Sequence, residues 1–258
     1  MEKETVYEPY KKWKKYKIIE KKDGKYLKLY DYLLRIDESN YIPKAGLLFE
    51  DILIDKCQNK KILDLGCGQL GILGLIALHY GADNVYSVDV DSRCIKWLNQ
   101  IIIDNNIKNM KTKESDMFSN IKENESFDLI LSNPPHMPMI NGKACDSGGK
   151  DGKKFIKEIL NNSLNHLNNN GSVIMMMFDF LGLDESFNDE ISIFQYAKDC
   201  GYNDCNIIYE FEKFILPGSV TYQNLNYIKN IYPKYNFGDI NPKCNIVICE
   251  FEKWKNVT

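Results

Sequence analysis

The sequence predicts an α/β fold with a doubly wound, mostly parallel sheet of seven strands and an antiparallel edge strand. Three observations lead to this prediction. Short apolar runs rich in β-branched residues alternate with longer segments of helical periodicity. Glycine or proline turns separate several of these segments. The last two strand-like runs alternate apolar with polar residues, a pattern typical of an antiparallel sheet edge.

The first predicted elements lie between residues 60 and 135. Lys60 to Gly68 reads KKILDLGCG, a buried strand that runs into a glycine turn. The next segment, Leu70 to Gly81, has a helical pattern that closes at a glycine. After it come a strand at Asn84 to Asp91, a helix from the N-cap residue Ser92 to about Asn105, a strand at Lys111 to Met117 and a strand at Phe127 to Pro135.

The remaining predicted elements follow a loop rich in glycine and charge. They are a helix from about Lys154 to Asn168, a strand with the sequence SVIMMMF, a helix at Ile191 to Cys200, and strands at Asn206 to Leu216 and Asn245 to Trp254. The run NNNG marks the end of the first of these helices.

The segment between the last two strands, Pro217 to Lys243, is long and rich in tyrosine. A connection of this length usually has a function of its own, so we expect a lid over the substrate. The chain length of 258 residues suits one complete α/β domain. We expect this domain at residues 46–258, with the lid at 217–243 as an insertion, and a lysine-rich extension at residues 1–45.

The extension carries nine lysines between Lys11 and Lys28, with Trp13, Tyr16 and Tyr26 among them. Such a run could meet the phosphates of a nucleic acid or an acidic partner. Charge patterning alone favours the solvated face of a terminal helix or hairpin. The net charge of -3 gives no overall attraction to nucleic acid.

The composition, 44% apolar and 27% charged, is that of an ordinary water-soluble globular chain. We find no apolar stretch long enough to span a bilayer and no signal peptide in the charged first residues, so we expect a cytoplasmic protein without a membrane partner. The eight cysteines are irregularly spaced, which favours free thiols. Cys244 and Cys249 would face opposite sides of a strand, and we expect no metal site.

The first strand ends in Asp64-Leu65-Gly66-Cys67-Gly68, with glycines at the GxGxxG spacing before a helix. Asp89 lies at the end of the second strand, where a carboxylate can accept hydrogen bonds from both hydroxyls of a ribose. A dinucleotide such as NAD would satisfy these two features. Asp64 argues against it, because this carboxylate at the mouth of the turn would repel a pyrophosphate. A cationic nucleoside such as S-adenosylmethionine (SAM) fits better.

The third strand ends in Ser115-Asp116-Met117, which offers a carboxylate to an adenine amino group and an apolar side chain to its ring. The segments DLGCG, VDVD, SDMF and SNPP, in this order, resemble the motifs of class I SAM-dependent methyltransferases, whose fold is Rossmann-like. The resemblance covers about Leu47 to Phe178. It implies that the residues that bind SAM are Asp64, Gly66, Cys67, Gly68, Asp89, Val90, Asp116, Met117 and Asn133.

Asn133-Pro134-Pro135-His136 follows the fourth strand, at the edge where open α/β sheets bind ligands. It resembles the (Asp/Asn)-Pro-Pro-aromatic motif of enzymes that methylate glutamine amides, the amino groups of bases and some small molecules. In such acceptors the nitrogen lone pair is delocalised, so the NH₂ group must be held with that pair pointed at the methyl group. The side-chain oxygen of Asn133 and the carbonyl of Pro134 can each accept one N–H, and the prolines stiffen the turn.

His136 occupies the position where the family has an aromatic residue. The imidazole could stack on the acceptor, form a hydrogen bond with it, take the released proton, or only close the turn. The resemblance implies N-methylation, and we expect the acceptor to be a protein side chain or small molecule, because the lysine-rich beginning is the one basic surface that the sequence offers. A nucleobase acceptor in RNA or DNA and a non-catalytic SAM-binding protein are the alternatives.

Overall fold

The structure is a computed structural model that describes residues 4–6, 16–37, 44–142, 145–185 and 191–254. Seven of its strands form one sheet in the order β10-β11-β9-β8-β5-β6-β7. These strands are β5 (Lys61–Leu65), β6 (Asn84–Asp89), β7 (Met110–Glu114), β8 (Phe127–Ser132), β9 (Leu167–Phe178), β10 (Asp204–Phe214) and β11 (Lys243–Glu252).

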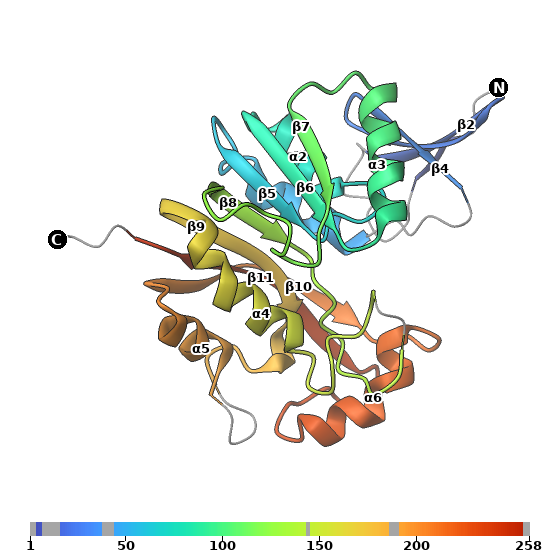
Figure 1. The fold of residues 1–258 in the computed structure, drawn as a ribbon. Coiled ribbons are helices and arrows are strands. Elements are labelled where there is room, and N and C mark those ends of the chain that lie inside the picture. The colour runs from blue at the N-terminus through green and yellow to red at the C-terminus, as the bar shows by residue number, and fades with distance from the viewer. Residues whose placement is uncertain (1–3, 7–15, 38–43, 143–144, 186–190, 255–258) are drawn as a thin grey trace. The chain divides into compact units, whose positions relative to one another are not determined.

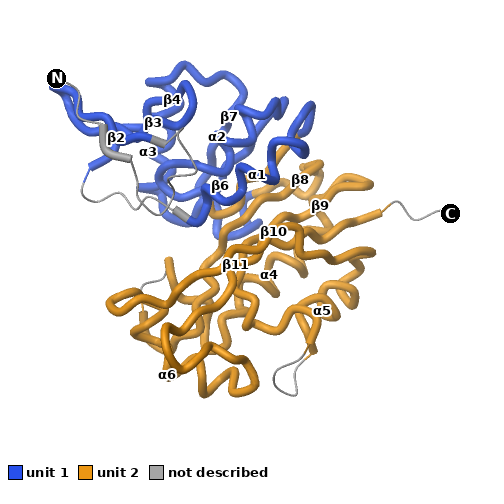
Figure 2. Tube along the Cα trace, turned by 180° about the vertical axis from the view of Figure 1, so that it is seen from behind, with its two compact units in different colours: residues 1–60, 67–120 blue, residues 61–66, 121–258 orange. Residues whose placement is uncertain are grey.

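The pairing within this sheet is mostly parallel. β5 pairs with β8, β8 with β9, and β6 with β7 in parallel. β11 runs antiparallel to both β9 and β10, so β10 is an antiparallel edge strand. The predicted fold class is confirmed. The chain divides into two compact units, one of residues 1–60 and 67–120 and the other of residues 61–66 and 121–258 (Figure 2).

The first unit contains β6, β7 and the helices α1 (Glu50–Leu53), α2 (Ile72–His79) and α3 (Ser92–Asp104). α3 packs against β7 and β6, and α2 packs against β6 (Figure 1). The N-cap of α3 is Asp91, whose carboxylate accepts a hydrogen bond from the backbone N–H of Arg93, so the predicted N-cap Ser92 is wrong by one residue. Leu98 of α3 leaves no space for a side chain at Gly71, because an added Cβ there would lie 2.7 Å from the leucine.

The amino-terminal part of the first unit folds as a sheet of its own. The strands β1 (Glu4–Val6), β2 (Tyr16–Lys21), β3 (Gly24–Leu29) and β4 (Tyr32–Ile36) pair antiparallel in chain order. Its regular alternation buries one face, with Leu27, Leu29, Leu34 and Ile36 inside. The extension predicted at residues 1–45 thus contains more regular structure than the helix or hairpin considered from charge alone.

The second unit contains β5, β8, β9, β10, β11 and the helices α4 (Lys154–Ser163), α5 (Ile193–Cys200) and α6 (Val220–Ile231). α4 packs against β9 and α5, and α5 packs against β10 (Figure 1). α4 ends five residues earlier than predicted, because a 3-10 turn follows at Leu164–His166 and the NNNG run belongs to β9. α6 lies inside the segment 217–243, for which the sequence predicted no helix.

No helix among the described residues is long and apolar enough to cross a membrane. The same residues hold no group of three or more His, Cys, Asp or Glu side chains placed to bind a metal ion. The eight cysteines are free thiols, and five of them are buried.

Candidate active site

The glycine turn after β5 has a backbone that only glycine adopts easily. Gly66 and Gly68 have φ angles of +78° and +63°. An added Cβ at either residue would meet no atom within 4 Å, so the turn is open where a ligand would approach the backbone. Between them Cys67 is buried and its N–H donates to the carbonyl of Val88 at 2.9 Å. This open, glycine-lined backbone fits a nucleoside cofactor such as SAM.

Asp89 connects the turn to the end of β6. Its Oδ2 accepts a hydrogen bond from the N–H of Gly68 at 2.8 Å, and its Oδ1 accepts one from the N–H of Asp91 at 2.9 Å. A carboxylate has about four lone-pair sites, so each oxygen can still accept a ribose hydroxyl. Next to it the side chain of Val90 is 64% exposed and so accessible to a ligand.

The turn after β7 is held by Ser115, a buried residue without a predicted role. Its N–H donates to the carbonyl of Asp89 at 2.9 Å, which joins the ends of β6 and β7. Its hydroxyl donates to the carbonyl of Met117 at 2.8 Å. Met117 has a φ of +47°, which costs free energy in a residue other than glycine, and strain of this kind concentrates at functional sites. Asp116 is exposed between them.

Asp64 is more deeply buried than the other predicted cofactor residues. It lies within β5, beside Leu131 of β8, and its relative exposure is 0%. Gly66, two residues on, is exposed. Within the second unit Asp64 is therefore an acidic group buried directly before the turn.

The predicted acceptor residues follow β8 in the second unit. The hydroxyl of Ser132, the last residue of β8, donates to the carbonyl of Leu65 at 2.9 Å and joins the ends of β8 and β5. Asn133 comes next and is half-buried. Its side-chain amide forms no hydrogen bond with any residue that the structure describes. The half-buried amide is therefore free of hydrogen bonds to this part of the chain and available to a ligand.

His136 is a neutral imidazole in this structure. Its Nδ1 lies 2.7 Å from the carbonyl oxygen of Pro134, which can only accept, so Nδ1 carries the hydrogen and Nε2 is the acceptor. Burial lowers the pKa of His136 to about 4, a value that also includes the raising effect of the bond to Pro134 and a smaller lowering effect of the nearby Lys213 ammonium. The ring meets that of Phe178, the last residue of β9, edge to face at 4.7 Å.

The glycine-rich loop after the motif packs closely against the backbone of His136. An added Cβ at Gly148 would lie 2.7 Å from the Cα of His136, and one at Gly152 would lie 2.7 Å from its carbonyl oxygen. The N–H of Gly148 also donates to the carbonyl of Met137 at 2.9 Å. A loop of this composition is common in sequences, yet at two of its positions glycine is the only residue type that fits against the acceptor turn.

The tyrosine-rich segment anchors itself to the same region. Tyr232 is buried and its hydroxyl donates to the carbonyl of Asp151. The hydroxyl of Tyr235 donates to Asp179 at 2.7 Å, and burial raises the pKa of that carboxyl group. The ring of Phe180 contacts both tyrosines and stacks on Phe178 at 4.9 Å. These tyrosines hold the chain in place, while Tyr222 of α6 is 45% exposed.

Lys213 is a residue near His136 that the sequence analysis missed. It lies on the inward side of β10, and its ammonium nitrogen is 5.0 Å from the ring centre of Phe178. Its hydrogen-bond partner is the hydroxyl of Thr221 at 3.2 Å. Burial lowers its pKa. The sequence shows a lysine in an alternating strand, but not that the strand end lies beside the Asn-Pro-Pro turn.

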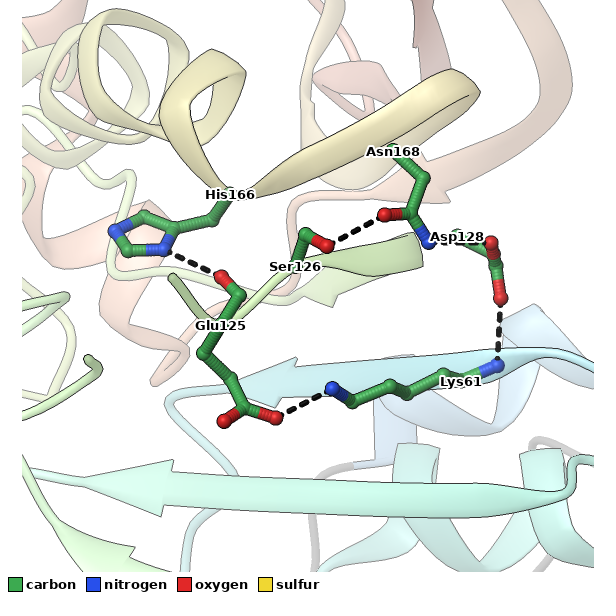
Figure 3. Close-up of polar contacts among 6 residues, drawn as sticks. All are labelled: Lys61, Glu125, Ser126, Asp128, His166 and Asn168. Carbon is green, nitrogen blue, oxygen red and sulfur yellow. Dashed lines mark hydrogen bonds and ion pairs between the residues drawn. The ribbon is translucent and has the colours of Figure 1, made fainter. Parts of the chain in front are cut away.

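A second polar cluster of the same unit lies at the opposite ends of β5 and β8 (Figure 3). The ammonium group of Lys61 forms an ion pair with Glu125, and the backbone N–H of Lys61 donates to the carboxylate of Asp128 at 2.9 Å. The other oxygen of Asp128 accepts from the amide of Asn168 at 2.7 Å. The ring of His166 bonds to the carbonyl of Glu125 at 2.9 Å. These groups form hydrogen bonds and an ion pair with one another, so the cluster stabilises the strands and does not need a ligand.

A family model described as the methyltransferase small domain matches residues 44–203, more than half of the chain. The chain belongs to this family. The predicted enzyme class, a SAM-dependent methyltransferase, and the cofactor SAM are confirmed by this membership.

Two relatives show the range of the similarity. A protein of Methanocaldococcus jannaschii, provisionally named a protein N5-glutamine methyltransferase, is 30% identical over 163 residues, which are 60% of this chain and 80% of that protein. The release factor glutamine methyltransferase of Rhodopirellula baltica is 25% identical over 181 residues, which are 58% of either chain. The chain therefore spans little more than half the length of the release factor enzyme.

Solved structures agree with the fold. A 16S rRNA methyltransferase of T. thermophilus, determined in complex with AdoMet and guanosine, superposes with a TM-score of 0.53 at 15% identity and covers 92% of this chain and 50% of its own. The YcgJ protein of Bacillus subtilis gives 0.55 at 13% identity and covers 80% of this chain and 98% of its own. At these identities the likeness concerns the fold alone.

Proposed function

We propose that the protein methylates a planar nitrogen, most readily the amide of a protein side chain or of a small molecule. One observation carries this proposal: the half-buried amide of Asn133, at the carboxyl end of β8, has no hydrogen-bond partner among the described residues. Its oxygen is available to accept one N–H of an acceptor NH₂ group. The names of the two relatives, both glutamine methyltransferases, support an amide acceptor.

The carbonyl of Pro134 is the second proposed acceptor. It takes the Nδ1–H of His136, and its other lone pair can accept the second N–H of the substrate. Two bonds in one plane turn the face of the nitrogen, and its lone pair, toward the incoming methyl group. SAM, when bound, supplies that methyl group on a sulfonium centre. Both bonds strengthen as the nitrogen becomes positive, so Asn133 and Pro134 stabilise the transition state more than the ground state.

Of the roles considered for His136, this proposal keeps two: orienting the carbonyl of Pro134 and accepting a proton. Its Nδ1–H fixes the carbonyl of Pro134, which favours an orienting role, and its edge-to-face contact with Phe178 fixes the ring. Nε2 is left as an acceptor that can receive a proton from the methylated nitrogen. The proposed cofactor residues are those of the glycine turn and of the ends of β6 and β7: Gly66, Cys67, Gly68, Asp89, Val90, Asp116 and Met117.

The test is a tritium survey. The purified protein and SAM with a tritiated methyl group are added to fractionated lysate, which is then treated with protease or with nuclease. We expect label that protease releases and that the variant Asn133→Ala does not transfer. Label that only nuclease releases would assign a nucleobase acceptor, and absence of label with intact SAM binding would leave a non-catalytic SAM-binding protein.

A nucleobase acceptor is the second candidate, and one observation favours it. Lys17 and Lys28 lie directly opposite each other on β2 and β3 and so bring two positive charges together, which phosphates of a nucleic acid could meet. On the same sheet face Lys21 lies over the ring of Tyr26 at 5.2 Å. The lysines at positions 11, 12, 14 and 15 lie outside the described residues. Replacing Lys21 and Lys28 by methionine should flatten the salt dependence of RNA binding if this face binds phosphates.

The segment 217–243 is proposed as the lid over the acceptor. Its helix α6 begins at the Ser219 cap beside exposed apolar side chains, Leu216 and Val220, at the end of β10. Tyr227 donates to the carbonyl of Lys150 at 3.0 Å and so ties the helix to the glycine-rich loop. Deletion of the exposed ring in Tyr222→Ala should raise KM for the acceptor and leave SAM affinity unchanged.

A further inference from the structure

Lys213 places a cation where a strand normally places an apolar residue. Along β10 it shares the inward side with Tyr209 and Phe211, and the buried Ile215 follows just after the strand ends. Glu210 and Glu212 are exposed on the other side. Lys213 is half-buried, and even partial burial of an ammonium group without an ion pair costs free energy, so a lysine at this place needs a reason.

The surroundings of Lys213 do not neutralise it. No carboxylate of the described residues forms an ion pair with its ammonium group, and the hydroxyl of Thr221 takes a single N–H. Cys244 of β11 lies directly opposite Lys213. Burial raises the pKa of this thiol to about 12, so it stays protonated. His136 is neutral as well. The ring of Phe178 contributes only a cation–π contact at 5.0 Å.

Phe178 also places this cation beside the acceptor turn. The ring of His136 meets Phe178 at 4.7 Å, and the ammonium of Lys213 lies 5.0 Å from the centre of the same ring. We therefore expect an acceptor held by Asn133 and Pro134 to bind in the same part of the unit as this positive charge. The ammonium keeps two N–H groups for an oxygen that the acceptor brings.

We propose that Lys213 is a specificity-determining residue that binds a carboxylate carried by the acceptor close to the nitrogen that is methylated. The single ammonium group matches the single charge of a carboxylate, whereas a phosphate monoester carries up to two charges. The favoured acceptor is then an amide with an acidic neighbour. The inference rests on the proposed function, because it assumes that the acceptor binds at Asn133.

Binding of acetate tests the cation without any assumption about turnover. Protein labelled with carbon-13 at the ε-carbon of lysine is titrated with sodium acetate, and separately with inorganic phosphate, at constant ionic strength. Lys213→Met assigns the resonance. We expect the Lys213 signal to shift with saturation at about 1–10 mM acetate. Lys243, an exposed lysine paired with Glu212, is the internal control and should shift without saturation.

Methyl transfer to peptides gives the second readout. Two peptides carry the same central glutamine amide, flanked by glutamate in one and by the neutral glutamine in the other. We expect the wild type to prefer the acidic peptide roughly tenfold or more in kcat/KM, through KM. Lys213→Met should lose this preference, Lys213→Arg should keep part of it, and the control Lys243→Met should keep all of it.

The outcomes separate the two proposals. Equal transfer to both peptides by the wild type, with loss of both in Asn133→Ala, would overturn the role of Lys213 and leave the proposed function intact. If neither peptide accepts methyl groups, the amide acceptor is in question, and the acetate titration still decides whether Lys213 binds carboxylate. An unsaturated acetate response equal to that of Lys243 would instead mean that Lys213 only discourages pairing of the edge strand with another chain. Saturation by phosphate and not by acetate would contradict the carboxylate and indicate a phosphorylated acceptor.

Discussion

The two ends of β8 differ in how their polar groups are satisfied. At the amino end Asp128 accepts hydrogen bonds from the N–H of Lys61 and from the amide of Asn168 (Figure 3). At the carboxyl end the amide of Asn133 has no hydrogen-bond partner among the described residues. The nearby ammonium group of Lys213 donates to the hydroxyl of Thr221 and has no carboxylate partner among them. The described residues satisfy the polar groups of one end internally, whereas at the other end Asn133 is available to a ligand.

This difference matters because the two asparagines have different hydrogen bonds to lose. Removing the partner of a buried donor or acceptor costs about 1–3 kcal/mol, which is a large part of the stability of a domain. The half-buried amide of Asn133 has no such bond to a described residue, so its replacement by alanine leaves none of those residues unpaired. The comparison therefore indicates a structural role for Asn168 and is consistent with the catalytic role proposed for Asn133, although both are asparagines at strand ends of one unit.

The largest expected effect is that of Asn133→Ala. The substitution removes one of the two oxygens that hold the acceptor nitrogen, so kcat should fall by roughly 10²–10³. SAM affinity by calorimetry and the midpoint of thermal unfolding should change little, because the side chain has no partner to lose. Transfer at the wild-type rate would remove the basis for a planar-nitrogen acceptor.

Asp89 has both a structural and a proposed binding role. Its carboxylate accepts hydrogen bonds from backbone N–H groups and is also proposed to bind the ribose. Asp89→Ala should weaken SAM binding by about 2–4 kcal/mol, as expected for two charge-assisted hydrogen bonds. It should also lower thermal stability, because the N–H groups of Gly68 and Asp91 lose their acceptor. Unchanged affinity in calorimetry, with the stability loss present, would show that Asp89 only shapes the turn.

Asn168→Ala is the matched control at the other end of β8. It should cost about 1–2 kcal/mol of unfolding free energy in urea, because Asp128 and Ser126 each lose a hydrogen bond. The kcat for methyl transfer should stay within a factor of two of the wild type. A hundredfold loss of kcat with unchanged stability would reverse the assignment of the two ends.

Most of the sheet was predictable because a buried parallel strand has a simple sequence pattern. The runs at β5, β6 and β8 begin within a residue of the predicted positions. α6 was missed although Thr221, Leu225, Ile228 and Tyr232 are buried at helical spacing, because the many polar and tyrosine residues between them obscured that pattern. The end of α4 was misplaced because an asparagine run favours a helix stop, whereas Leu167 already pairs with Phe127 of β8 and β9 begins before that run.

The candidate site was predictable to the extent that it follows strand ends. Gly68 and Asp89 lie together as expected, and Asn133 lies at the end of β8. The contributions of Lys213, Gly148 and Ser115 were not visible in the sequence. Each depends on a contact between segments distant in the chain, and a strand-end lysine or a loop glycine has the same sequence pattern whether or not it touches the site.

A modest effect on kcat is expected at His136. His136→Phe keeps the edge-to-face contact with Phe178 and removes the bond to the carbonyl of Pro134, so kcat should fall roughly threefold to tenfold. Because the pKa of His136 is lowered to about 4, the ring stays neutral through the neutral range, and kcat should show no inflection near the ordinary value of 6.5. An inflection near 6.5 that disappears in His136→Phe would contradict the neutral ring.

The same pKa has a consequence for stability. The folded state keeps His136 neutral, while the unfolded chain binds a proton below about pH 6.5. The contribution of the neutral His136 to the free energy of unfolding is therefore fully present above pH 6.5 and is lost as the pH falls from there toward about 4. Urea unfolding at pH 7.5 and pH 5 should show a larger loss for the wild type than for His136→Phe.

The atom that receives the methyl group tests the central claim most directly. Protein labelled by transfer from tritiated SAM is hydrolysed in acid, and the volatile products are identified. Methylation of an amide nitrogen predicts tritiated methylamine, because hydrolysis of an N-methylated amide releases that amine, and Asn133→Ala should release little. Tritiated methanol, which a methyl ester gives, or label retained on sulfur would contradict the account.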